Sequence, residues 1–132
     1  MACANIEELL GKTLREVKKH CDDIAIFFAT TDGEEYLMYH YQNCCEDVYI
    51  EDISGDLNCL INYPITLAEE VSNSNEIDWG SETWTYYKLA TIKGYVTIRW
   101  YGTSNGYYSE SVDFIKISDR WGREQLKQYF NE

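Results

Sequence analysis

The 132-residue sequence has no lysine or arginine between His20 and Tyr87, although 15 aspartates and glutamates fall within that stretch. The basic residues lie only toward the two ends of the chain, and the formal net charge is −12. A surface with this charge pattern repels phosphates over most of its area, so we expect no direct binding to nucleic acid. The imbalance is compatible with a basic protein partner, a bound cation, or simple solubility.

Long apolar runs are also missing. No segment approaches the run of about 20 apolar residues that spans a bilayer, and the first ten residues lack the apolar core of a secretory signal peptide. The five cysteines make an odd number, and they are Cys3, Cys21, Cys44, Cys45 and Cys59. We therefore expect a cytoplasmic protein with reduced thiols, no membrane association and a single acidic domain over residues 1–132.

Periodicity and capping residues predict an α+β fold with short helices near both ends. Asn5 is placed to cap the N-terminal helix, and Asp119 to cap a C-terminal helix that ends near Tyr129. The spacing of Leu14 and Val17 also weakly favours a helix over residues 13–20, because it puts both side chains on one helical face.

The remaining segments predict antiparallel β-structure. A hairpin over residues 24–41 turns at Asp32-Gly33, where the Asp-Gly pair tolerates positive φ. A short strand covers residues 48–53, which alternate apolar and acidic side chains. A helical turn is predicted over residues 56–61, after which the polar residues 72–82 are predicted to form the longest loop.

The second half of the chain carries the clearest strand pattern. Three strand-like runs lie within residues 83–117, separated by turn signals at Lys93-Gly94 and Asn105-Gly106. They predict a three-stranded antiparallel meander. Alternation in the middle run places Trp100 on the same side as Val96 and Ile98, which are expected to face the core.

Aromatic residues are abundant in this half. The chain has twelve tyrosines and four tryptophans, and 11 of these 16 residues lie from Trp79 onward. Aromatic rings stack on flat ligands such as nucleobases, with about 1–3 kcal/mol per base; alternatively, they fill a sheet core and form cross-strand pairs. The residues predicted to form a nucleotide-binding pocket are Trp84, Tyr86, Arg99, Trp100, Tyr101, Ser104, Asn105, Tyr107 and Tyr108.

Carboxylates gather between the predicted hairpin and the aromatic half. They form no calcium-binding loop of the Asp-x-Asp-x-Asp-Gly type. Carboxylates at alternating strand positions can imitate the phosphates of a nucleic acid and occupy the basic groove of an enzyme, although a solvated acidic face has the same composition. The residues predicted to contact a basic partner are Glu46, Asp47, Glu51, Asp52 and Asp56.

His40, Cys44, Cys45 and Glu46 form the most reactive-looking cluster. Zinc sites prefer cysteines spaced by two to four residues, and adjacent cysteines at a strand end point to opposite faces. Acidic surroundings also disfavour a reactive thiolate. We therefore predict no metal, cofactor or catalytic residue and expect a buried structural thiol, with Gln42 and Glu46 fixing a turn. A small cysteine enzyme is the weaker alternative.

Three motifs occur together: Gln42-Asn43-Cys44-Cys45-Glu46, Thr83-Trp84-Thr85-Tyr86-Tyr87-Lys88, and Trp100-Tyr101-Gly102-Thr103-Ser104-Asn105-Gly106-Tyr107-Tyr108-Ser109. They resemble a family of small domains found in bacteriophages, prophages and their hosts, over roughly residues 10–117. That family usually has Asp at the position of Asn43, so this chain has one carboxylate fewer. The resemblance implies a phage or mobile-element origin, and many small phage proteins of this kind counter host defences.

Together these features favour a non-enzymatic binding protein that blocks a component of a host defence system. In one version the acidic residues inhibit a basic, nucleic-acid-handling enzyme, as an anti-CRISPR protein or an acidic immunity protein does. In the other, the aromatic pocket sequesters a small nucleotide immune signal. A homo-oligomer is compatible with both versions.

Overall fold

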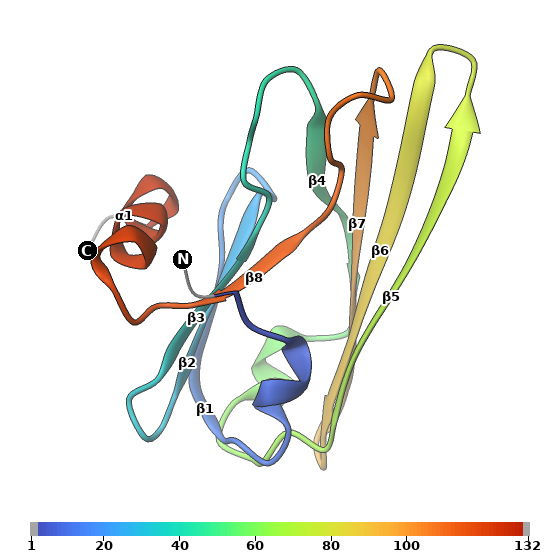
Figure 1. Cartoon of the computed structure of the whole chain (residues 1–132). Helices are drawn as coiled ribbons and strands as arrows, with labels where there is room; N and C mark the ends of the chain where they lie inside the picture. The colour runs from blue at the N-terminus through green and yellow to red at the C-terminus, as the bar shows by residue number, and fades with distance from the viewer. Residues whose placement is uncertain (1–2, 131–132) are drawn as a thin grey trace.

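The computed structural model describes residues 3–130, which form two four-stranded antiparallel sheets and one α-helix (Figure 1). The two sheets stack face to face, and the helix covers the other side of one of them, so the chain has three layers. The predicted α+β class is confirmed, although strands far outnumber helices. Within the described residues, no helix is long and apolar enough to cross a membrane.

The first sheet lies between the helix and the second sheet, with the strand order β1-β2-β3-β8. Its strands are β1 (Leu14–Lys19), β2 (Ala25–Thr30), β3 (Glu35–Tyr39) and β8 (Asp113–Lys116). The β2–β3 hairpin confirms the predicted one, and Gly33 in its turn has a φ of 92°. Both faces of this sheet are buried along β2, which explains why this strand is apolar except for Thr30.

The helix predicted over residues 13–20 is wrong, because this segment is strand β1. The register of β1 against β2 shifts between Leu14 and Glu16, so that Arg15 is the extra residue of a bulge. A bulge moves the next inward position by one residue. Leu14 and Val17 therefore contact the same core at a spacing of three, which imitates the spacing of a helix.

The second sheet has the strand order β4-β7-β6-β5 and forms an outer layer. Its strands are β4 (Asp47–Ser54), β5 (Leu67–Ile77), β6 (Gly80–Thr91) and β7 (Gly94–Ser104). β5 and β6 pair residue for residue up to Ile77 and Gly80, which leaves Asp78 and Trp79 as a two-residue turn. The loop predicted over residues 72–82 is therefore wrong: it is the tip of a long hairpin.

The three-stranded meander predicted over residues 83–117 is only partly present. β6 and β7 do form a hairpin, which turns at Ile92-Lys93. The third predicted strand is β8, which pairs with β3 in the other sheet. Phe114 faces the core between the sheets and Ile115 faces the helix, and only the middle layer of the molecule can bury both side chains. β4 takes the place beside β7 instead.

Two cores hold the layers together. The larger core lies between the sheets, and it includes Trp100, Tyr87 and Leu89 from the second sheet. The smaller one lies between the first sheet and the helix α1 (Arg120–Tyr129), where Leu126 is buried against Phe27 and Leu37. Two 3₁₀ helices, η1 (Ile6–Leu9) and η2 (Leu57–Leu60), close the end opposite the β5–β6 tip. No element of the described chain covers the outer face of the second sheet.

The predicted helix caps are confirmed. The Asn5 side chain accepts a hydrogen bond from the Glu7 amide at 3.0 Å and forms a capping box with Glu8. The Asp119 carboxylate accepts one from the Gly122 amide at 2.8 Å and begins α1. These short polar side chains satisfy amide groups that the first turn of a helix leaves without partners.

Candidate functional site

Four of the predicted ligand-binding residues lie together on the outer face of the second sheet. Trp84 is paired across the strands with Tyr101, and Tyr86 with Arg99. The rings of Trp84 and Tyr101 are 4.4 Å apart between centroids, and the Arg99 guanidinium lies 5.6 Å from the Trp84 ring. These side chains are half-buried by one another and form a flat aromatic patch.

Trp100 lies on the opposite side of the same strand. Only 1% of it is exposed, and its indole N–H donates to the Met38 sulfur at 3.4 Å. Its prediction as a ligand-binding residue is therefore wrong, because alternation along β7 turns it into the core between the sheets.

Ser104 is also turned inward and is 2% exposed. It donates to the carboxylate of Glu110, which also accepts hydrogen bonds from Ser81 and from Thr83. Burial alone would raise the pKa of Glu110, but these three hydroxyl donors lower it below its ordinary value. Ser104 thus holds the loop after β7 against the sheet and is not accessible to a ligand.

The last three predicted ligand residues lie in that loop. The Asn105 side chain accepts a hydrogen bond from the Tyr107 amide at 2.9 Å, which shapes the turn. Tyr107 is 83% exposed and meets Tyr108 edge to face, with 5.0 Å between the ring centroids. The nine predicted residues therefore do not converge on one pocket.

The predicted acidic band is divided among several local roles. Glu51 forms a two-pronged ion pair with Arg99, with Oε2 2.7 Å from Nε and Oε1 3.0 Å from Nη2. Asp56 accepts the Asn58 amide at 2.9 Å and caps η2. Oδ2 of Asp52 lies 4.0 Å from Nη2 of Arg99, so this arginine partly neutralises the band, while Asp47 is exposed.

Glu46 is buried, with 4% exposure, so its prediction as a partner-contacting residue is wrong. Its carboxylate accepts the amides of Asn43 and Cys44, both at 2.9 Å, and lies 2.7 Å from Nε2 of His40. Nδ1 of His40 is 2.6 Å from the carbonyl oxygen of Ser111. A carbonyl only accepts, so Nδ1 donates to it, while Nε2 faces the Glu46 carboxylate. The pair therefore ties the loop after β3 to the loop before β8.

The lowered pKa of the Glu46 carboxyl predicts that the protein loses stability in acid. Burial would raise its pKa, but the two amides and His40 outweigh burial and lower the pKa to about 2. A folded-state pKa below the unfolded value stabilises the protein above that unfolded value, and the stabilisation disappears as the pH falls. We expect the free energy of unfolding to drop by about 3 kcal/mol between about pH 4.5 and pH 2 through this group. Urea denaturation at a series of pH values measures this drop, which should be absent from Glu46→Gln.

Cys44 and Cys45 are both exposed, and their sulfur atoms are joined as a vicinal disulfide. The predictions of a buried structural thiol and of side chains pointing to opposite faces are therefore wrong, because the pair lies in an open loop and not at a strand end. A group with metal-ligand donors lies elsewhere, at His20, Cys21 and Asp22 in the turn between β1 and β2. There Nδ1 of His20 already accepts the Asp22 amide at 3.0 Å.

Strand β5 is the feature of the structure that the sequence-based predictions missed. It forms an edge of the second sheet, and residues 69–76 are exposed on both faces. Because Ile77 and Gly80 flank a two-residue turn, these two residues must exchange backbone hydrogen bonds. Alternation then directs the backbone N–H and C=O groups of four residues toward the open edge. These residues are Glu70, Ser72, Ser74 and Glu76.

Comparison with known protein families gives a match. A family model described as "Domain of unknown function (DUF7448)" matches residues 7–114. No curated protein and no solved structure matches the chain. The matched region holds β1 to β7 and the first half of β8, whereas α1 lies outside it. The family model thus covers both sheets and most of the sequence, and the chain belongs to the DUF7448 family.

Proposed function

We propose that this protein is a non-enzymatic binding protein of phage or prophage origin that blocks a basic component of a host defence system. The phage context rests on the three sequence motifs. The observation that carries the binding role is the open edge of β5, which offers a row of unpaired backbone groups to a partner strand.

The regularity of β5 favours strand addition. Proteins usually protect an edge strand with charged side chains, especially lysine, or with proline, a bulge or a short length. β5 has 11 residues, contains neither lysine nor proline, and pairs with β6 without a register shift, so its three glutamates are its only protection of this kind. β5 reaches the tip of the hairpin, where Asp78 and Trp79 form the turn to β6 (Figure 1).

Charge selects the kind of partner. Glu69, Glu70 and Glu76 are all exposed along β5, and no basic residue of the chain lies between positions 21 and 86. A second copy of this acidic edge would bring like charges together, which disfavours self-pairing. An extended segment rich in lysine or arginine would find both backbone partners and opposite charge, as a nucleic-acid-handling enzyme can provide.

The reactive-looking side chains are engaged with one another, which favours binding over catalysis. His40 and Glu46 form a buried pair, and the sulfur atoms of Cys44 and Cys45 are joined. A nucleophilic mechanism needs an accessible thiolate beside a base, and the small cysteine enzyme is accordingly the weaker alternative.

Charge reversal along β5 tests this proposal. Glu70→Lys with Glu76→Lys should weaken binding to a basic defence enzyme at least tenfold, because the backbone groups of both residues point to the added strand and their carboxylates would lie beside its basic side chains. Biolayer interferometry against a panel of purified nucleic-acid-handling defence enzymes measures this, and phage plating on hosts carrying the same enzymes measures the block. The matched control is Asp22→Lys with Glu124→Lys, which changes the net charge equally on exposed sites outside the second sheet.

Proline substitution separates backbone pairing from charge. Ser74→Pro removes an amide that points to the open edge, so the fold should persist while binding falls. Asn73→Pro removes an amide bonded to β6 and should destabilise the hairpin instead. Full binding by both the charge-reversed and the Ser74→Pro proteins would contradict docking at β5.

A second candidate function is the sequestration of a nucleotide signal, which the aromatic patch around Trp84 and Tyr101 favours. Its rings are half-exposed beside Arg99, and flat bases stack on such surfaces. Isothermal titration calorimetry against cyclic and linear nucleotides tests it. Heat that disappears in Trp84→Ala would favour sequestration, and no heat with any nucleotide would remove it.

A further inference from the structure

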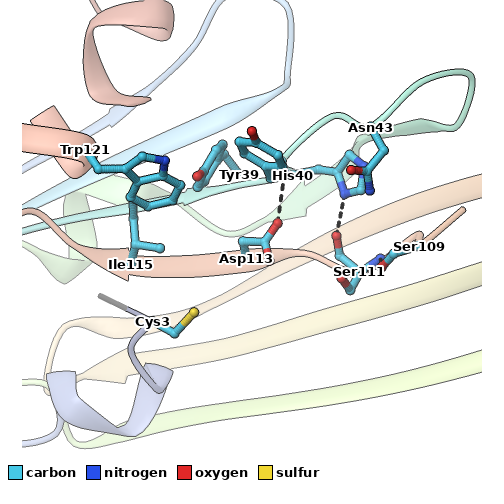
Figure 2. A pocket seen from close by; sticks show the side chains of 10 residues that line it. Cys3, Tyr39, His40, Asn43, Ser109, Ser111, Asp113, Ile115 and Trp121 are labelled. Carbon is cyan, nitrogen blue, oxygen red and sulfur yellow. Dashed lines mark hydrogen bonds between the residues drawn. The ribbon is translucent and has the colours of Figure 1, made fainter. Parts of the chain in front are cut away.

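A cavity of about 390 Å³ lies beside β8, on the side of the first sheet that α1 covers (Figure 2). Its volume falls within the range of small-ligand sites. One wall is aromatic and comes from Tyr41 and Trp121, whose ring centroids are 6.2 Å apart at an angle of 36°. Tyr39 and Ile115 form the apolar floor.

The cavity contains one carboxylate without a cationic partner. Oδ2 of Asp113 accepts the Tyr41 amide at 2.8 Å, and Asp113 forms no ion pair with any residue that the structure describes. No lysine or arginine lines the cavity. His40 does line it, but its two ring nitrogens are engaged by Glu46 and by the Ser111 carbonyl. The cavity therefore presents an uncompensated negative charge.

Further acceptors surround this carboxylate. Ser109 and Ser111 lie at the same opening, with their hydroxyl oxygens 2.8 Å apart, and the amide of Asn43 lies across from them. Several acceptors around one carboxylate match a ligand with several N–H donors. A guanidinium has five N–H donors in one plane, forms bidentate hydrogen bonds with a carboxylate and stacks on aromatic rings.

We propose that this cavity binds a guanidinium group. Asp113 supplies the opposite charge, the serine hydroxyls and Asn43 accept the remaining donors, and the faces of Tyr41 and Trp121 contact the flat cation. The group can belong to a free small molecule or to an arginine side chain of a protein. This site is separate from the β5 edge and does not rest on the function proposed above.

Isothermal titration calorimetry with N-acetyl-L-arginine amide tests the site, and the Trp121 indole N–H signal in NMR spectra locates it. We expect binding at least tenfold tighter than that of the matching citrulline amide, which is neutral, and tighter than that of the lysine amide. Asp113→Asn should weaken binding about 10- to 100-fold, because it removes the charged acceptor but keeps an oxygen for the Tyr41 amide. The control Asp52→Asn, which changes an exposed carboxylate on the second sheet, should leave binding unchanged.

A second variant distinguishes a loss of binding from a change of fold at β8. Trp121→Leu removes an aromatic face and leaves Asp113 in place, so it should also weaken binding. No binding of the arginine amide, equal binding of the citrulline amide, or wild-type affinity in folded Asp113→Asn would overturn the cation site. Equal binding of the lysine amide would overturn its assignment to guanidinium. Agmatine and a Gly-Arg-Gly peptide distinguish the sources of the guanidinium. Tighter binding of agmatine would indicate a free small molecule, and tighter binding of the peptide would indicate an arginine side chain of a protein.

Discussion

Replacing Trp100 with alanine is expected to lower the free energy of unfolding by about 3–5 kcal/mol. The indole is 1% exposed and fills the space between the two sheets, where its N–H contacts the sulfur of Met38. Truncation leaves a cavity that the surrounding β-strands cannot close, because their spacing is fixed by backbone pairing. Urea denaturation followed by circular dichroism measures the loss.

Trp84→Ala is the matched control, since it removes the same ring type from the outer face of the same sheet. Its main partner is Tyr101 on the next strand, and loss of a cross-strand pair costs about 1 kcal/mol or less. Similar losses for the two variants would show that the inner and outer faces of β6 and β7 have been assigned incorrectly.

Glu46→Ala is expected to destabilise the protein by about 4–5 kcal/mol at neutral pH. The substitution removes one partner from a buried charged pair and leaves the amides of Asn43 and Cys44 without an acceptor. Such a loss costs about 3–5 kcal/mol, and the two amides left without an acceptor keep the cost near the upper end. Chemical denaturation measures it, and NMR should show altered signals in both loops that the pair connects.

The control for this prediction is Glu46→Gln. Glutamine keeps an oxygen for the backbone amides but carries no charge, like the protonated carboxyl. We expect a loss of about 3 kcal/mol, equal to the loss on protonation of Glu46 in acid and smaller than the loss for alanine. Equal losses for alanine and glutamine would mean that the negative charge alone, and not the hydrogen-bonded geometry, stabilises this part of the fold.

Local signals in the sequence predicted the elements that local chemistry determines. Asn5 and Asp119 were identified as caps because their side chains satisfy nearby amides. The hairpin at Asp32-Gly33 followed from a turn sequence and flanking apolar residues. Strict alternation predicts that Trp100 faces the core with Val96 and Ile98. This conflicts with its prediction as a ligand-binding residue, so the sequence alone already argues against that role.

Elements that depend on tertiary pairing were not predictable in this way. β1 imitates a helix because a bulge at Arg15 changes the spacing of its inward side chains. β5 consists largely of serine, asparagine and glutamate, which favour loops, and it is a strand because β6 supplies its hydrogen bonds. β8 belongs to the first sheet because both of its faces are buried. The burial of Glu46 could not be predicted either, because it depends on the contact between its carboxylate and His40.

Amide hydrogen exchange along β5 tests the central claim most directly. In the free protein, we expect the amides of Glu70, Ser72, Ser74 and Glu76 to exchange fast, and those of Val71, Asn73 and Asn75 to be protected by β6. Addition of a basic defence enzyme that the protein binds should protect the first set and leave the second unchanged. Protection of the first set before any partner is added, or fast exchange that persists in the complex, would contradict an open edge that binds a partner strand.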